Sequence, residues 1–144
     1  MTNGRSIKSV FGIVVADSEV LFLKRSDTTS RPGQWGLPGG GVKKGECPER
    51  ACIREVEEEA GLVVSVARSV GTFSHTRYFL CGPGDAGREV RLAKSESSDY
   101  AWVAPKECMK IGPIMDLGRL LPLFESLGMA VPALPEGLSP KYPD

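Results

Sequence analysis

Three glutamates in the middle of the chain, Glu55, Glu58 and Glu59, have the residue type and spacing to bind a metal ion. At positions i, i+3 and i+4 of a helix their carboxylates share one face and repel one another. Arg54 can reach Glu58, but it supplies one positive charge against three negative ones. A divalent cation would relieve the repulsion, and ligands that are all oxygen indicate a hard ion, Mg²⁺ first and Mn²⁺ second. The alternative is an acidic helix face exposed to solvent.

The sequence around the glutamates predicts the helix that positions them. Glu49–Ala60 is an uninterrupted helix-forming stretch, with Pro48 at a plausible first position and Gly61 just past the end. At about 100° per residue, Cys52, Ile53, Val56 and Ala60 form an apolar arc, and the carboxylates adjoin it. The acids are therefore expected at the edge of a buried layer.

A glycine-rich segment, residues 37–46, precedes this helix. Gly39 and Gly40 allow close backbone approach, so that their carbonyl groups can bind a metal and their amides can face phosphate oxygens. No Gly-Lys-Ser/Thr sequence follows, which excludes a P-loop. We do not expect a segment so rich in glycine to form a packed element.

The spacing from Gly40 to Leu62 resembles the Nudix box. Gly40 is followed by five residues, Glu46, seven residues, and then Arg-Glu-Val-Glu-Glu-Glu-Ala-Gly-Leu, and every fixed position of the box is matched. The Trp-Gly-Leu-Pro-Gly-Gly sequence that ends at Gly40 is similar to the segment that precedes the box in that family. The resemblance implies an α/β fold, a Nudix-like α/β/α sandwich with a mixed β-sheet.

The same resemblance implies Mg²⁺-dependent hydrolysis of a pyrophosphate bond in a nucleoside diphosphate derivative. Glu58 and Glu59 would bind the metal, and Glu55 would be either a ligand or the base that activates water. Arg54 would orient the glutamates, and Glu46 would pair with Arg54 or contact the metal through water. The carbonyl group of Gly39 or Gly40 would complete the metal's ligand set.

Residues outside the box extend this predicted site. Glu96, on a later loop, is the expected further metal ligand, with Asp99 as its competitor. Arg25 resembles a substrate-contacting arginine, with an exposed charge at a strand end as the alternative. Trp35 could stack on a base, with packing as the alternative. Tyr78 stands where relatives that cleave ADP-ribose often carry proline, and a tyrosine there resembles the dinucleoside-polyphosphate branch.

These features favour a small nucleotide substrate, such as a canonical, oxidised or modified (d)NTP, hydrolysed to NMP and pyrophosphate. A dinucleoside polyphosphate is the alternative substrate. A nucleotide-binding Nudix module without activity is the alternative of another class, although such modules usually have gaps in the box.

The remaining elements predict a layered domain over residues 1–127 and an irregular proline-rich tail over 128–144. We expect a hairpin of residues 9–16 and 19–25, a loop over 26–36, and a turn at 82–87. Further strands are expected at 62–73, 76–81, 90–93 and 100–104, a helical turn at 105–110, and a helix at 114–127 interrupted by Pro122.

Composition narrows the class of protein. Eighteen basic and eighteen acidic residues give a formal charge of zero, which argues against a dedicated nucleic-acid surface. No apolar run has the length of a membrane span, and the first nine residues lack the apolar stretch of a signal peptide. The four cysteines form no Cys-x-x-Cys pair, so we expect reduced thiols in a cytoplasmic protein. Whether it forms a homodimer is left open.

Overall fold

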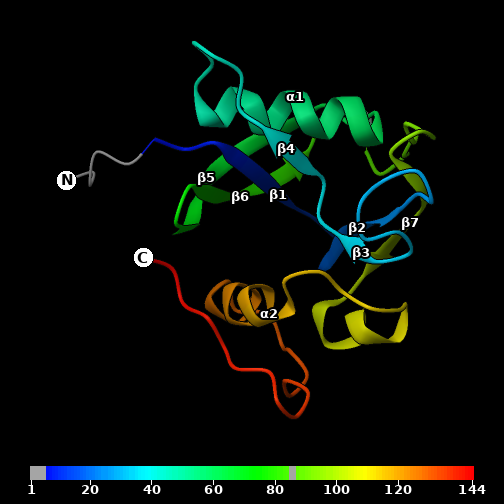
Figure 1. Cartoon of the computed structure of the whole chain (residues 1–144), viewed down its shortest axis with the longest axis vertical. Coiled ribbons are helices and arrows are strands. Elements are labelled where there is room, and N and C mark those ends of the chain that lie inside the picture. Colours follow the sequence, from blue (N-terminus) through cyan, green and yellow to red (C-terminus); the bar gives the residue numbers. More distant parts are fainter. Residues whose placement is uncertain (1–5, 85–86) are drawn as a thin grey trace.

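The computed structural model describes residues 6–84 and 87–144, and it has the expected α/β/α architecture. Helix α1 (Pro48–Ala60) covers one face of a mixed sheet, and helix α2 (Leu117–Ser126) covers the other (Figure 1). Within the described residues, no helix has the length and apolar character needed to cross a membrane.

The sheet combines one parallel pair with antiparallel ones. Its strand order is β3-β2-β1-β6-β5, with β4 paired to β1 and β7 paired to β2. Strands β1 and β6 run parallel, and the other pairs are antiparallel. The strands are β1 (Ser9–Ala16), β2 (Glu19–Arg25), β3 (Trp35–Gly36), β4 (Gly39–Gly41), β5 (Val64–Phe73), β6 (Thr76–Pro83) and β7 (Ser97–Val103), and a 3₁₀ helix, η1, spans Pro105–Lys110.

Strand β1 is buried on both faces because its side chains alternate between two cores. Val10 and Val14 pack with the apolar side of α1, whereas Ile13 packs with α2. Gly12 leaves room for the helix, since a Cβ there would lie 3.1 Å from a methyl group of Val56. Helix α1 is therefore seated closely on the strand next to the glycine-rich segment.

The hairpin and η1 have the bounds expected from the sequence. The glycine-rich segment differs from its expectation, because Gly39–Gly41 forms strand β4 and pairs with the first residues of β1. A Cβ at Gly39 would lie 2.2 Å from the carbonyl oxygen of Val10, so the absence of side chains permits this pairing. The expectation of an unpacked segment was wrong, and the expected loop over 26–36 also contains strand β3 at its end.

The strand expected at residues 90–93 is absent from the described structure. Instead, the Arg91 amide donates to the carbonyl oxygen of Ala60 at 2.7 Å, and the Ala93 amide donates to that of Glu59 at 3.2 Å. These carbonyls end α1 and have no partner within the helix. The segment therefore caps the end of a helix and does not join the sheet. In the expected turn at 82–87, Gly82 and Pro83 instead complete β6, and residues 85 and 86 lie outside the described chain.

Pro122 lies inside α2 and does not interrupt it. A proline lacks the amide that would bond the carbonyl group four residues earlier, which is that of Gly118. The Lys141 amide donates to this carbonyl at 2.7 Å, and the Asp144 amide donates to Thr72 at 2.8 Å. The tail is irregular as expected, but it docks on the domain and supplies the bond that Pro122 removes.

Candidate active site

Helix α1 presents the glutamates because its ends and its buried side match the sequence pattern. It begins at Pro48 and is followed by Gly61, whose φ of 69° is left-handed and whose amide donates to Glu57. Ala51, Cys52, Val56 and Ala60 are buried against the sheet. Glu55 and Glu59 lie at the edge of that buried side, and Glu58 lies further out.

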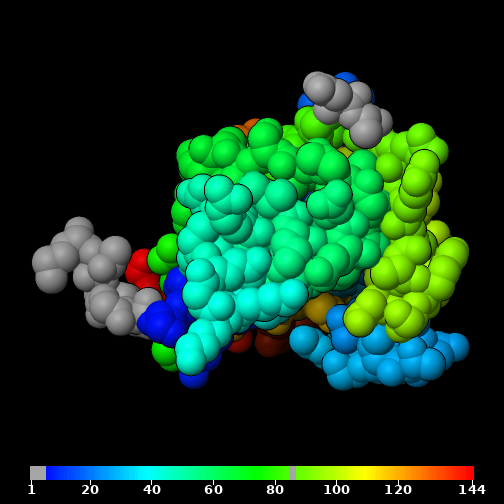
Figure 2. Space-filling view, turned by 90° about the horizontal axis from the view of Figure 1, so that it is seen from above, coloured from blue at the N-terminus to red at the C-terminus, as the bar shows by residue number. Residues whose placement is uncertain are grey.

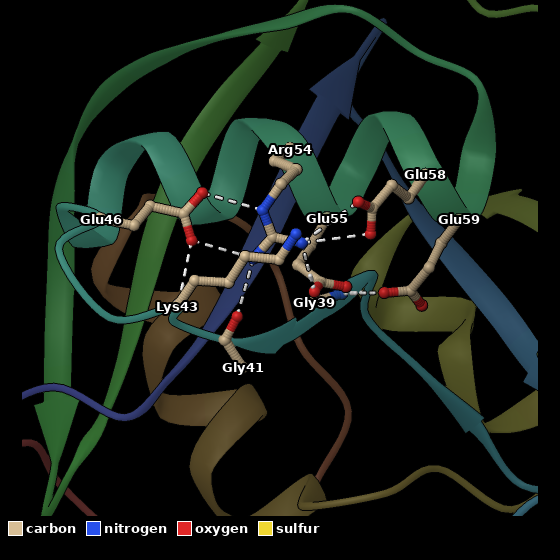
Figure 3. Close-up of polar contacts among 8 residues, drawn as sticks. All are labelled: Gly39, Gly41, Lys43, Glu46, Arg54, Glu55, Glu58 and Glu59. Carbon is tan, nitrogen blue, oxygen red and sulfur yellow. Dashed lines mark hydrogen bonds and ion pairs between the residues drawn. The ribbon is translucent and has the colours of Figure 1, made fainter.

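Arg54 is the centre of the polar network on this helix (Figure 3). Its Nε and Nη2 donate to the two carboxylate oxygens of Glu46 at 2.8 and 2.9 Å. Its Nη1 donates to Glu55 at 2.9 Å and to Glu58 at 3.1 Å, and Nη2 also donates to the carbonyl oxygen of Gly41 at 2.9 Å. One guanidinium thus connects the glycine-rich segment to two of the three clustered glutamates.

Glu46 completes this network from the loop before the helix. Hydrogen bonds from Arg54 and from the Lys43 amide lower the pKa of Glu46 to about 2. Glu46 is therefore an anion at neutral pH, and it fixes the guanidinium from the side opposite the cleft acids. This contact is one of the two that the resemblance implied for Glu46.

Glu59 is in a different environment from its neighbours. Its Oε2 accepts a hydrogen bond from the Gly39 amide at 3.1 Å, and Arg54 does not contact it. Burial raises the pKa of Glu59 to about 8 despite that hydrogen bond, and the nearby carboxylates of Glu55 and Glu96 add to the rise. Glu59 is the acid whose negative charge most needs a cation beside it.

The glutamates line a cleft of about 530 Å³ between α1, β4 and the loop that precedes β7. Figure 2 shows the residues around 90–100 beside α1, with the loop between β2 and β3 next to them. Glu96 lies in this cleft, whereas its competitor Asp99 lies on β7 and is exposed. The lining residues are Arg25, Gly39, Gly40, Gly41, Glu55, Glu58, Glu59, Ala93, Ser95 and Glu96.

Ser26 joins the two loops that border the cleft. Its amide donates to the carbonyl oxygen of Glu96 at 3.0 Å, and its hydroxyl donates to that of Ser95 at 2.8 Å. Ser26 is 7% exposed, so these bonds are shielded from water. They hold Glu96 beside Arg25, and this proximity could not be read from residues about 70 positions apart.

The chemical type of the donor groups in the cleft suits a hard divalent cation. Four carboxylates and the backbone carbonyl groups of Gly39 and Gly40 are all oxygen donors around one cleft. Among residues 6–84 and 87–144, however, no three such acidic, histidine or cysteine side chains are gathered closely enough to hold a metal. Arg54 holds Glu55 and Glu58, and Gly39 holds Glu59, so the acids line the cleft without converging.

A smaller chamber of about 150 Å³ continues from the cleft past Arg25. It shares Arg25, Gly39, Gly40 and Glu59 with the cleft, and its wall is otherwise mixed apolar and polar. The further lining residues are Phe11, Leu23, Ser30, Arg31, Gly36, Leu37, Ser97 and Met115. A narrow apolar slot beyond it reaches Tyr78, Asp116 and Leu120.

The predicted substrate contacts have different positions in this arrangement. Arg25 lines both the cleft and the chamber. Trp35 is 6% exposed, belongs to the core beside α2, and does not line the cleft or the chamber. Tyr78 is 1% exposed and reaches only the slot, where burial raises the pKa of its hydroxyl. Packing, the alternative considered for Trp35, is therefore its position here.

Sequence reasoning missed Arg31, Met115 and Asp116, which line the chamber or the slot. None of them belongs to a motif, and they come from segments before β3 and before α2. Arg31 and Asp116 share one unusual property, a positive φ of 51° and 57°. That property belongs to the backbone, and neither residue type predicts it.

Known proteins resemble this chain over most of its length. The NUDIX domain model matches residues 7–123. A "MutT-like protein" of Streptomyces ambofaciens is 36% identical over 127 residues, which span 83% of this chain and 78% of that protein. A "Nucleoside triphosphatase NudI" of Escherichia coli (strain SE11) is 33% identical over 113 residues, which span 66% of this chain and 79% of that protein. The crystal structure of a MutT protein from Methanosarcina mazei Go1 has a TM-score of 0.65 at 25% identity, covering 89% of this chain and 96% of that one.

Proposed function

This chain belongs to the Nudix family and is a Nudix pyrophosphohydrolase, and we propose that it hydrolyses a small nucleotide, a (d)NTP of canonical, oxidised or modified base, to NMP and pyrophosphate. The main support is the cleft in which Glu55, Glu58, Glu59 and Glu96 face Arg25. Anionic groups that can bind a metal and a cationic arginine that can bind phosphate therefore border one space.

We propose Mg²⁺ as the cofactor, with Mn²⁺ as a substitute. When bound, the ion would neutralise phosphate oxygens and promote ionisation of water. Glu58, Glu59 and Glu96 would hold it, with Glu55 and the carbonyl group of Gly39 or Gly40 as further ligands. The raised pKa of Glu59 agrees with this proposal, because burial and then the nearby carboxylates of Glu55 and Glu96 disfavour its negative charge, which a bound cation would stabilise.

The protein's own residues have separate tasks in this scheme. Arg54 keeps Glu55 and Glu58 oriented toward the cleft, and Glu46 keeps Arg54 in place. Glu55, which lines the cleft, is the candidate base, the role that the resemblance implies for it as the alternative to metal binding. Arg25 binds phosphate oxygens at the junction of cleft and chamber through charge-assisted hydrogen bonds.

The chamber supports a nucleoside as the group attached to the phosphates. Its wall includes the apolar side chains of Phe11, Leu37 and Met115, which suit the face of a base or sugar, and Glu58 lines the cleft but not the chamber. The relative named as a nucleoside triphosphatase supports the same substrate class. Tyr78, the residue that resembles the dinucleoside-polyphosphate branch, is buried and lines the slot beyond the chamber.

A panel of nucleotides assayed with Mg²⁺, with Mn²⁺ and with chelator tests the proposal. The panel contains nucleoside triphosphates, a nucleoside diphosphate sugar and a dinucleoside polyphosphate, and products are identified by mass. We expect NMP and pyrophosphate from a triphosphate, and loss of turnover with chelator. Binding of nucleotides without turnover of any of them would instead identify a non-catalytic module.

A further inference from the structure

A short turn over residues 93–97 carries Glu96 to the cleft. The Glu96 amide donates to the carbonyl oxygen of Ala93 at 2.9 Å and closes the turn. The pKa of Glu59, raised mainly by burial, is raised further by the Glu96 carboxylate, so these two acids lie near each other. Glu96 is exposed, and the place of its carboxylate therefore depends on how the backbone of the turn is held.

The turn is held from two sides, by α1 and by the loop between β2 and β3 (Figure 2). On the first side, the Ala93 amide donates to the carbonyl oxygen of Glu59 at 3.2 Å. On the second side, the Ser26 amide donates to the carbonyl oxygen of Glu96 at 3.0 Å, and the Ser26 hydroxyl donates to that of Ser95 at 2.8 Å. Among these three bonds, the one from the hydroxyl alone depends on residue type, because the others join backbone groups.

The Ser26 hydroxyl is shielded from water, since the residue is 7% exposed. The Thr28 hydroxyl lies 3.1 Å from it and contacts the same carbonyl oxygen of Ser95 at 3.0 Å. Thr28 is exposed, so water competes for its bond, whereas a hydrogen bond in a shielded position is stronger. The Ser26 hydroxyl is therefore the main side-chain contact from this loop to the turn that carries Glu96.

Arg25, the residue before Ser26, is fixed by contacts of its own. Its carbonyl oxygen accepts a hydrogen bond from the Gly33 amide at 3.0 Å. Its side chain donates to the carbonyl oxygen of Ser30 at 2.5 Å and to the Ser30 hydroxyl at 3.2 Å. These bonds stay within the β2–β3 loop, so loss of the Ser26 hydroxyl should displace Glu96 and leave Arg25 in place.

We infer that Ser26 is a positioning residue for the metal site, whose hydroxyl keeps Glu96 beside Glu59 so that both can bind one divalent ion. The inference rests on the proposed function, in which these two acids hold Mg²⁺, and it adds a residue outside the Nudix box. An ion shared between α1 and the turn is bound less tightly when the turn is displaced. Ser26 does not line the cleft, so it would act on metal affinity and not on the reacting groups.

Ser26→Ala tests this inference because it removes the hydroxyl and keeps the backbone bonds. Mn²⁺ is the probe, titrated without nucleotide and followed by electron paramagnetic resonance. We expect Ser26→Ala to weaken Mn²⁺ binding at least threefold. The matched control is Thr29→Val, since the Thr29 hydroxyl donates to the carbonyl oxygen of Ser26 at 2.8 Å, inside the same loop. This control should change Mn²⁺ binding less than about 1.5-fold.

A double-mutant cycle shows whether Ser26 acts through Glu96. Glu96→Gln should weaken Mn²⁺ binding at least tenfold, and adding Ser26→Ala should weaken it no further, because the positioned carboxylate is already gone. In turnover assays, Ser26→Ala should raise the Mg²⁺ concentration for half-maximal activity at least threefold. The KM for nucleotide at saturating Mg²⁺ should stay within twofold of wild type, because Arg25 keeps its bonds.

The outcomes separate the inference from the proposed function. Unchanged Mn²⁺ binding in Ser26→Ala, an equal loss in Thr29→Val, or a full further loss in the Glu96→Gln background would each overturn the role of Ser26. Unchanged binding in Glu96→Gln would overturn it as well, because Glu96 would then not hold the metal. A wild-type protein that hydrolyses no nucleotide would refute the proposed function, whereas the Mn²⁺ titrations still decide whether Ser26 positions a metal ligand.

Discussion

Helices α1 and α2 cover opposite faces of the same sheet, yet different interactions hold them. α1 buries only small or medium side chains and is organised at its surface by Arg54, which contacts two of its own residues and the preceding loop. α2 buries Leu120, Leu121, Leu123 and Phe124 in the larger core and depends on the tail for one backbone bond. The chain thus separates chemistry, on the polar α1, from apolar packing, on α2.

Substitution of the acidic residues on α1 should have the largest effect on activity. We expect Glu58→Gln or Glu59→Gln to reduce kcat at least a hundredfold, because an amide cannot supply the anionic oxygen that a divalent ion requires. Circular dichroism and the thermal midpoint should stay close to wild type. Glu57→Gln is the matched control, since Glu57 is an exposed residue of the same helix. Near-wild-type rates in both active-site variants would show that these acids do not hold a metal.

Removing the centre of the α1 network should have the next largest effect. Arg54→Ala leaves Glu55 and Glu58 without the donor that orients them, so we expect kcat to fall at least tenfold and the Mg²⁺ concentration for half-maximal activity to rise. Arg54→Lys should recover little, because an ammonium cannot reproduce the paired donors to Glu46. The comparison variant is Arg50→Ala, which removes an exposed charge from the same helix. An unchanged Mg²⁺ dependence in Arg54→Ala would contradict the orienting role.

Changes on the α2 side of the sheet should lower the stability of the protein and leave the Mg²⁺ dependence of its activity unchanged. Deleting residues 141–144 removes the backbone bonds from Lys141 to Gly118 and from Asp144 to Thr72, and the bond that the Asp144 carboxylate accepts from the Ser74 amide. At about 1 kcal/mol each, we expect a loss of about 3 kcal/mol in the free energy of unfolding, measured by urea denaturation. Pro122→Ala restores an amide to Gly118, so the deletion should cost less in that background. Equal costs in both backgrounds would show that the tail does not replace the missing bond.

Substitution of Gly61, just past the end of α1, should have the smallest effect, a small loss of stability. Gly61→Ala forces a left-handed alanine and places its Cβ 2.8 Å from that of Arg91. We expect a loss of about 1 kcal/mol or slightly more in the free energy of unfolding. Gly45→Ala, with a φ of 80° and no atom within 4 Å of the added Cβ, measures the conformational cost alone. A smaller loss at Gly61 than at Gly45 would mean that Arg91 moves aside freely.

The predictable parts of the molecule are those whose signals are local. The ends of α1, the hairpin of β1 and β2, and η1 follow from residues within one or two turns of each other. Strand β4 was missed because glycine has low strand propensity, and its pairing depends on a close approach to β1. The prediction of a strand at residues 90–93 fails because a short apolar segment can pair in a sheet or cap a helix, and its composition does not distinguish the two.

Residue types and spacing alone predict that one helix carries clustered carboxylates beside an apolar side, with Arg54 within reach, because helical periodicity depends only on spacing. The tertiary contacts between distant segments set which groups lie near these acids: Glu96 enters the cleft through its bonds to Ser26, and Arg31 lines the adjoining chamber through the fold of its loop around Arg25. They also decide that Trp35 packs in the core. The physical reason is that these positions depend on backbone hydrogen bonds and burial between segments far apart in the chain, which residue type and spacing do not encode.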